Sequence, residues 1–198
     1  MKKGFIACMM LVLGLVFLIG TSEAALISFQ KLPSEVLPGA PITFEVWLDK
    51  LEEALSDIAC FGLYIGAPPG VTWNTSYITT TTKANPDYVF YGTTSYFDAT
   101  ILGSNVLITD VGIPPTLTTE VPVKLASLKL DQNFPYCTLL TFSVLDSDWS
   151  YALDSSLVQD NFKPITGEVH VTPIPGTLLL LGSGLIGLLG VARRRIRR

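Results

Sequence analysis

The chain has 198 residues, of which 48% are hydrophobic and 15% are charged, and its formal net charge at pH 7 is −4. This value conceals an uneven distribution, because two of the 13 basic residues lie in residues 1–24 and five lie in residues 173–198. Residues 25–172 keep six lysines, no arginine and 16 acidic residues, a net charge of −10. Such a surface excludes nucleic acid and anionic lipid as electrostatic partners, since lysine and arginine supply that attraction.

The N-terminus has the three parts of a secretory signal peptide. Two lysines stand near its start, and an apolar run broken only by glycine extends over residues 5–19. Small residues follow at Ser22 and Ala24, the positions that signal peptidase reads. We therefore expect residues 1–24 to form a signal helix that is cleaved after Ala24, with Ala25 as the alternative site. A retained N-terminal anchor is the other interpretation.

The strand signals begin after this segment, and residues 25–172 have the length of one domain. Apolar and polar residues alternate in residues 42–48, with Thr43, Glu45 and Trp47 on one side, and this period is that of a β-strand. Turns rich in proline and glycine separate the segments, as in a sandwich or barrel. The expected strands are residues 25–30, 42–48, 58–66, 70–74, 87–91, 105–112, 122–130, 137–145 and 167–171. We interpret residues 49–57 as a loop and the threonine-rich residues 75–83 as a loop or edge segment, so no helix is expected within residues 25–172.

Three of these segments resemble cohesin-type domains. Residues 27–49 resemble the opening pair of strands, residues 58–73 the third strand with its turn, and residues 123–130 a late strand. The third strand departs from the family pattern at Ile65, where most relatives carry an aspartate after the aromatic residue. The resemblance implies an all-β fold, a cohesin-like jelly-roll β-sandwich of about nine strands. It also implies a sheet face that binds another protein module.

Two cysteines remain in residues 25–172, Cys60 and Cys137. An even pair in an exported domain favours a disulfide. The resemblance places the two cysteines in neighbouring strands, which is compatible with a bridge. Two buried thiols are the alternative, because cysteines in strands often pack as apolar core residues.

Signals of enzymatic chemistry are sparse, and we predict that the protein is not an enzyme and has no catalytic residue. The single histidine, His170, has no partner set for a triad or a metal site, so we interpret it as structural or surface-exposed. Asp146, Asp148 and Asp154 are the best candidates for a calcium site, since calcium prefers carboxylate oxygens. Their spacing fits no known ligand loop, and a solvated acidic loop is the alternative. We therefore expect no cofactor, with calcium as the only candidate.

Aromatic residues are frequent in the expected loops and short strands, where their rings can stack on sugars or on another protein. They are Tyr77, Tyr88, Tyr91, Tyr96, Phe97, Trp149 and Tyr151. Ordinary packing is the alternative interpretation, because aromatic rings dominate protein cores. A row of exposed rings on one sheet face would be the mark of a carbohydrate-binding module.

The C-terminus combines an apolar segment with a basic end. Residues 177–192 are uncharged, and as a helix they would measure about 24 Å, against a hydrocarbon core of about 30 Å. Arginines keep their end of such a helix on the cytoplasmic side. The basic residues are Arg193, Arg194, Arg195, Arg197 and Arg198. We expect a short C-terminal transmembrane helix, with residues 25–172 on the other side of the membrane.

This tail resembles the PEP-CTERM sorting signal of Gram-negative bacteria that make exopolysaccharide. Pro173, Ile174 and Pro175 stand in the place of the Pro-x-Pro motif, and the apolar helix and arginine cluster follow in the family's order. Ile174 departs from the usual glutamate. The resemblance implies that a membrane protease, exosortase, removes the tail during export. Prolines enforce an extended segment and glycines weaken the helix that follows, so the chemistry of the segment is compatible with cleavage.

Together, these features predict an exported cell-surface or extracellular-matrix protein that acts in adhesion or in assembly of an exopolysaccharide biofilm matrix. Its partners would be signal peptidase and exosortase during export, the inner membrane transiently, and exopolysaccharide or another surface protein afterwards. A carbohydrate-binding module, a secreted hydrolase and a permanently anchored single-pass membrane protein are the alternatives. The expected division is residues 1–24, 25–172 and 173–198.

Overall fold

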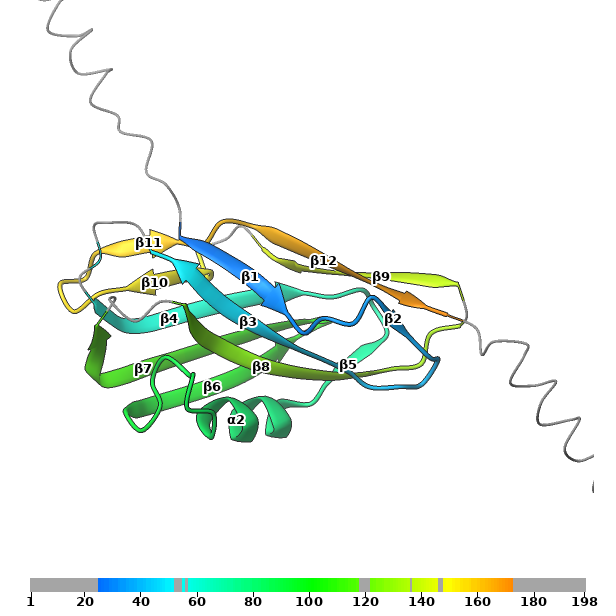
Figure 1. Cartoon of the computed structure of the whole chain (residues 1–198), viewed down its shortest axis with the longest axis horizontal. Coiled ribbons are helices and arrows are strands. Elements are labelled where there is room, and N and C mark those ends of the chain that lie inside the picture. The colour runs from blue at the N-terminus through cyan, green and yellow to red at the C-terminus, as the bar shows by residue number, and fades with distance from the viewer. Residues whose placement is uncertain are drawn as a thin grey trace, which may run out of the picture.

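The computed structural model describes residues 25–51, 55, 57–117, 122–135, 137–145 and 148–172. Within these residues the chain forms two packed β-sheets with one helix at their side (Figure 1). The predicted signal peptide, Pro-x-Pro motif, transmembrane helix and arginine cluster lie outside the described residues. Among the described residues, no helix is long and apolar enough to cross a membrane.

One layer is a four-stranded antiparallel sheet. Its order is β1 (Leu26–Gln30), β3 (Ile42–Lys50), β8 (Val123–Gln132) and β5 (Val71–Trp73). Side chains alternate between the two faces of a strand, and along β3 every second residue from Ile42 to Leu48 is buried. The predicted residues 42–48 therefore form a strand with the expected inner and outer faces.

The other layer is an eight-stranded sheet. Its main path is β11 (Gln159–Asn161), β10 (Tyr151–Leu153), β4 (Asp57–Gly66), β9 (Thr138–Val144), β12 (Ile165–Val171) and β2 (Glu35–Val36). Along the other edge of β4, the sheet continues through β7 (Asn105–Leu117) to β6 (Thr94–Leu102). Only the short β2 runs parallel to its neighbour, β12. The described residues thus contain twelve strands, where the sequence predicts about nine.

The core lies between the two sheets and is rich in aromatic rings. Phe44 of β3 packs against Phe142 of β9 with ring centroids 5.5 Å apart, and this contact joins the two layers. Phe29 of β1 meets Phe44 edge to face at 5.4 Å. Burial of each such ring contributes about 1.5–3 kcal/mol, so these residues connect the strand pattern of the sequence directly to the stability of the sandwich.

Residues 75–83, predicted as a loop or edge segment, form a helix instead: α2 (Thr75–Lys83). Its first turn is capped by the Asn74 side chain, which accepts a hydrogen bond from the Tyr77 amide at 2.9 Å. Ile78 and Thr82 lie on one face of the helix and are buried. Threonine has a low helix propensity because its side chain is branched at Cβ. Tertiary contacts outweigh that preference here.

Those contacts lie along one edge of β8. The Thr82 hydroxyl accepts a hydrogen bond from the Ser127 amide at 2.9 Å and donates to the Ser127 carbonyl at 3.4 Å. β5 pairs with the end of β8, and residues 87–89 pair with it at Lys124. Thr82 therefore supplies the bonds that a continuous neighbouring strand would make. The predicted strand 87–91 is wrong, since that segment is a turn with a single bridge at Tyr88.

The predicted disulfide is also wrong, because Cys60 and Cys137 are both free. β4 pairs with β9 only at Ile65↔Val144 and Gly66↔Ser143. Cys60 lies five residues before Ile65, and Cys137 lies seven residues before Val144, so in this antiparallel pair the two cysteines lie on opposite sides of the contact. At 3.4 Å per residue, they are about 40 Å apart along the strands. A disulfide requires a Cα separation of about 4.4–6.8 Å. Neither thiol is buried in the core, since Cys60 is half-buried and Cys137 is exposed.

Candidate interaction face

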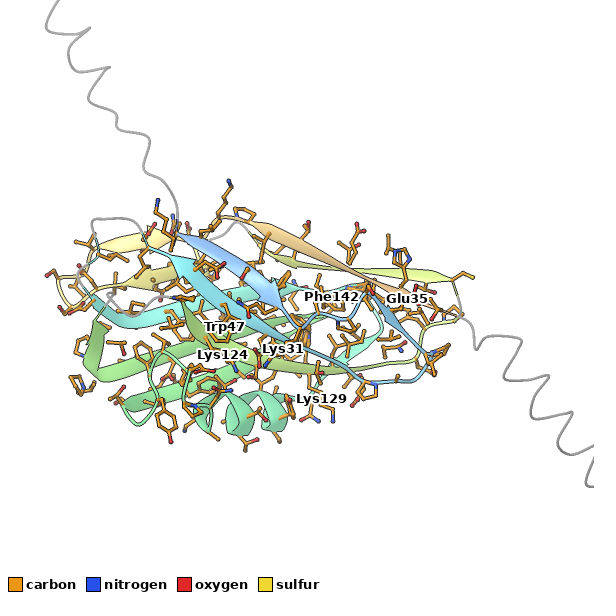
Figure 2. All side chains as sticks on the ribbon, viewed as in Figure 1. Lys31, Glu35, Trp47, Lys124, Lys129 and Phe142 are labelled. Carbon is orange, nitrogen blue, oxygen red and sulfur yellow. The ribbon has the colours of Figure 1, made fainter. Side chains whose placement is uncertain are left out.

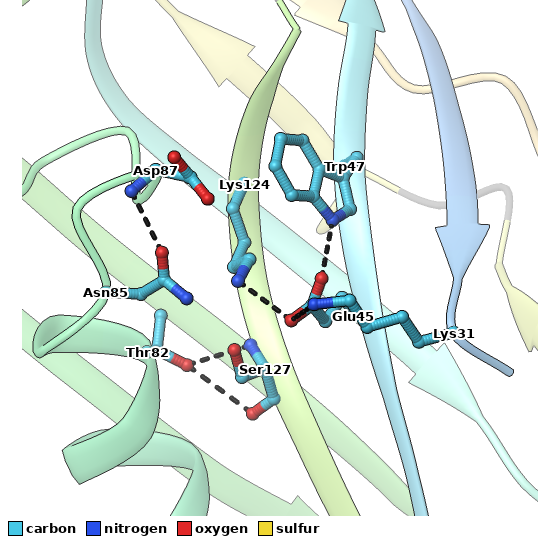
Figure 3. Close-up of polar contacts among 8 residues, drawn as sticks. All are labelled: Lys31, Glu45, Trp47, Thr82, Asn85, Asp87, Lys124 and Ser127. Carbon is cyan, nitrogen blue, oxygen red and sulfur yellow. Dashed lines mark hydrogen bonds and ion pairs between the residues drawn. The ribbon is translucent and has the colours of Figure 1, made fainter.

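The outer faces of the two sheets differ, and the four-stranded sheet carries a charged network (Figure 2). The carboxylate of Glu45 on β3 accepts hydrogen bonds from Lys124 Nζ at 2.8 Å and from Lys31 Nζ at 2.9 Å (Figure 3). Its second oxygen accepts from Trp47 Nε1 at 3.0 Å. The Trp47 ring also lies 5.3 Å from Lys124 Nζ, within the range of a cation–π contact.

The charged groups of this network are paired with one another. The Lys124 side chain is only 1% exposed, and the Glu45 carboxylate supplies its counter-charge. Burial of Glu45 alone would raise its pKa, but the hydrogen bonds from Lys124, Lys31 and Trp47 outweigh that effect and lower the pKa to about 2. The carboxylate is therefore ionised at every physiological pH. These side chains bind one another, which gives the network a structural role.

The eight-stranded sheet presents a different outer face, which follows from strand register. Residues that pair across neighbouring strands point to the same side of a sheet. We name the side away from the core the β4–β6–β7 face. Its side chains are Tyr96, Asp98 and Thr100 on β6, Leu107, Thr109 and Val111 on β7, Cys60, Gly62 and Tyr64 on β4, and Tyr151 and Leu153 on β10.

The β4–β6–β7 face is apolar and exposed at several positions. Tyr96 is 60% exposed, and its neighbour Val111 is 36% exposed. Ile113, further along β7, is 68% exposed. Outer faces of antiparallel sheets are usually polar when they meet only water, so this composition is unusual for a solvated surface.

Aromatic residues gather at one end of this face. A Cβ added at Gly62 would lie 2.9 Å from the Tyr151 ring and 2.6 Å from the Trp149 carbonyl, so the chain crosses β4 closely there. Glycine permits that approach because it has no Cβ. Trp149 is 59% exposed. The Tyr64 hydroxyl accepts a hydrogen bond from Asn105 Nδ2 at 2.8 Å, which fixes its ring.

The remaining predicted aromatic residues lie elsewhere. Tyr88 is buried, and its ring packs against Phe97, which faces the core. Tyr77 lies on α2 with Lys129 Nζ 5.5 Å from its ring centroid. Tyr91 is exposed in the turn before β6. The sequence thus identified two residues of the face, Tyr96 and Tyr151, together with Trp149, whose backbone carbonyl lies beside Gly62, but not the pairing that unites them.

One buried pair was missed by the sequence analysis. Tyr88 donates a hydrogen bond from its hydroxyl to Asp110, and the Val111 amide also donates to Asp110 at 2.6 Å. Burial raises the pKa of Asp110 and that of Tyr88. The only signal was an aspartate at an inward position of the apolar strand β7. The pair holds the turn around Tyr88 against that strand.

The calcium candidates do not form a site in the described residues. Asp154 is buried and accepts hydrogen bonds from the Ser156 amide at 2.9 Å and the Val158 amide at 2.8 Å, which closes the turn between β10 and β11. Asp148 is exposed, and Asp146 lies outside the described residues. No group of three His, Cys, Asp or Glu side chains that could hold a metal occurs in the described part of the chain.

Two further predicted positions have clear places. His170 is exposed on β12 and pairs in register with Glu35 of β2 and Leu139 of β9, as expected for a surface residue. Ile65, where cohesin-type sequences usually have aspartate, is fully buried on the core side of β4. The apolar side chain therefore packs in the core and does not reach the β4–β6–β7 face.

Solved structures with the same fold are cohesins, so the described residues form a cohesin-like β-sandwich. A cohesin module from a family 33 glycoside hydrolase of Clostridium perfringens matches with a TM-score of 0.55 and 10% identity, covering 75% of this chain and 97% of the module. A non-cellulosomal cohesin from the archaeon Archaeoglobus fulgidus matches with a TM-score of 0.51 and 10% identity, covering 77% of this chain and 96% of the other. No protein-family profile matches this sequence, and no curated protein is similar to it in sequence.

Proposed function

We propose that this protein is an exported, non-enzymatic binding module whose contact surface for another protein is the β4–β6–β7 face. The observation that carries the proposal is the exposure of Tyr96, Val111 and Ile113 on one sheet face. Contiguous apolar patches on a soluble domain mark interaction sites. The cohesin-like fold supports the proposal, since the family resemblance implies that a sheet face binds a protein module.

The sequence at the two ends supports export to the cell surface. A signal peptide in residues 1–24 would start the export of residues 25–172 from a Gram-negative bacterium. The PEP-CTERM-type tail, with Pro173 and Pro175 ahead of the apolar segment, would direct the protein to the surface or matrix and be removed by exosortase. Adhesion or assembly of the exopolysaccharide matrix is the role that combines this address with a binding face.

The sorting proposal is tested by the intact mass and the fractionation of the mature protein from its host. We expect a chain that starts at Ala25 or Leu26, lacks Arg198 and occurs outside the inner membrane. A product that still ends in Arg198 and sediments with the inner membrane would instead be a permanently anchored protein.

The binding proposal is tested by charge substitutions in the full chain, expressed in its host. Tyr96→Lys and Val111→Lys place a charge on the apolar patch and should release the proteins that co-purify with the wild type. Thr43→Lys is the matched control, because Thr43 is exposed on the outer face of the four-stranded sheet. Loss of partners in the Thr43 variant alone would assign binding to the other sheet.

A second candidate, carbohydrate binding, is favoured by one observation: Trp149, Tyr151 and Tyr64 lie at the same end of the face. Aromatic rings on a surface can stack on sugar rings. Trp149 is exposed whereas Trp73 is buried and Trp47 is half-buried, so a change in tryptophan fluorescence on adding host exopolysaccharide would report on Trp149. A fluorescence change that persists in Trp149→Phe would argue against this candidate.

A further inference from the structure

We propose that the protein partner of the β4–β6–β7 face presents lysine or arginine residues around an apolar centre. This inference depends on the proposed function, since it describes the partner of the same face. It follows from the positions of the charged residues in the two sheets.

The basic residues of the domain are segregated. The eight strands of the larger sheet contain no lysine and no arginine. Lys31 follows β1, Lys50 ends β3, and Lys83 ends α2. Lys124 and Lys129 both lie on β8 of the four-stranded sheet (Figure 2). The sixth lysine of residues 25–172, Lys163, lies in the connection before β12.

The acidic residues show the opposite distribution. The strands of the larger sheet contain Glu35, Asp57, Asp98, Asp110, Asp160 and Glu168. Asp110 and Asp160 are buried, but Asp98 lies within the β4–β6–β7 face, paired in register with Thr109. Glu168 is exposed on the same side of the sheet, on β12.

Neither of these two outward carboxylates is neutralised by a lysine. Asp98 accepts a hydrogen bond from the Thr100 hydroxyl at 2.5 Å, and the described residues place no cation beside it or beside Glu168. By contrast, the lysines of the other sheet are already engaged: Lys31 and Lys124 bind Glu45, and Lys129 lies over Tyr77. The face therefore carries uncompensated negative charge beside its apolar patch.

A domain with a net charge of −10 in residues 25–172 adds to this local negative potential. Opposite charges across an interface accelerate association, whereas like charges opposite one another cost free energy. A second copy of the chain would bring its own acidic face against Asp98. A polymer rich in carboxylates would meet the same repulsion. A protein surface with a basic rim is the occupant that fits both the apolar centre and the charge.

The experiment uses the full chain in its host, with a photo-reactive phenylalanine analogue at position 96. A second chain carries the same analogue at position 43, on the outer face of the four-stranded sheet. Mass spectrometry identifies the cross-linked segment, and the purified partner is then titrated against the mature protein at about 50 mM and about 500 mM salt.

We expect position 96 to cross-link to a protein with lysine or arginine close to the linked residue. The Kd should rise at least tenfold at the higher salt, because screening weakens the charge pairs. Asp98→Lys should raise the Kd about tenfold, and Asp98→Asn should raise it less. Asp131→Lys is the matched control, since Asp131 is exposed on β8, and it should leave the Kd unchanged.

Two outcomes distinguish the failure of this inference from the failure of the proposed function. A partner cross-linked at position 96 that is uncharged or acidic, a second copy of the chain, or a Kd that is insensitive to salt and to Asp98→Lys overturns the inference alone. The absence of any protein cross-linked at position 96 overturns the inference together with the proposed function.

Discussion

The outer faces of the two sheets differ in how their polar and apolar groups are used. On the four-stranded sheet, Glu45, Lys124 and Trp47 bind one another, and Lys124 is buried. On the larger sheet, Tyr96 and Val111 stand exposed and contribute little to the core. The polar side chains of the first face bind one another, whereas the apolar side chains of the second face are exposed to solvent.

This difference separates structural from functional residues by a physical criterion. Breaking a buried ion pair leaves an uncompensated charge in the protein, which costs free energy of unfolding. Replacing an exposed side chain usually changes stability by less than about 0.5 kcal/mol. Substitutions on the two faces should therefore divide into those that affect stability and those that affect only binding.

The largest loss of stability is expected for Glu45→Ala. This substitution leaves Lys124 buried without a counter-charge and should lower the free energy of unfolding by about 3–5 kcal/mol. Urea denaturation followed by tryptophan fluorescence measures the change. Thr43→Ala, on the same face of β3 but exposed, should change stability by less than about 0.5 kcal/mol. A similar small change for Glu45→Ala would remove the distinction between the faces.

The same carboxylate should make stability depend on acid pH. Its pKa of about 2 in the folded protein lies below the ordinary value, so the unfolded chain binds a proton more readily. The stabilisation is complete above the unfolded pKa of about 4.3 and is lost as pH falls toward 2, a change of at most about 3 kcal/mol. The stability difference between wild type and Glu45→Gln should therefore shrink over this range. A difference that stays constant would mean that Glu45 keeps its ordinary pKa.

A smaller loss of stability is expected for a substitution at the edge of β8. Thr82→Val keeps the shape of the side chain but removes both hydrogen bonds to Ser127, which should cost about 1–3 kcal/mol. Thr80→Val is the matched control, because the Thr80 hydroxyl is exposed and bonds only within α2. Equal unfolding midpoints for the two variants would show that α2 packs on β8 without help from Thr82.

The strands that form the core could be predicted because their pattern is local. β3, β4, β7, β8 and β9 alternate or run apolar over enough residues to reveal a strand. α2 could not be predicted from its threonines, since it depends on Ser127, which is 45 residues away in the chain. β6 was also missed, although apolar Phe97, Ala99 and Ile101 alternate with polar Asp98 and Thr100 along it.

The candidate site was predictable only residue by residue. The composition indicated Tyr96, Trp149 and Tyr151, but strand register decides which side chains share a face, and register depends on pairing across the whole domain. The Glu45 network gave no local signal, because Lys124 is 79 residues away from Glu45. The disulfide prediction was wrong because it considered only that the two strands are neighbours. Neighbouring strands do not fix how far apart two residues lie along them.

The smallest effect on stability is expected on the β4–β6–β7 face itself, at Tyr96. Its ring is 60% exposed, so Tyr96→Ser should change the free energy of unfolding by less than about 0.5 kcal/mol. An aromatic side chain at the centre of an interface can nevertheless dominate affinity, and its loss should weaken partner binding by about 2 kcal/mol, roughly 30-fold. Unfolding and binding measured on the same preparation test the two effects together. If Tyr96→Ser destabilised the fold as much as Thr82→Val does, the tyrosine would be a structural residue, and its exposure would no longer indicate a binding surface.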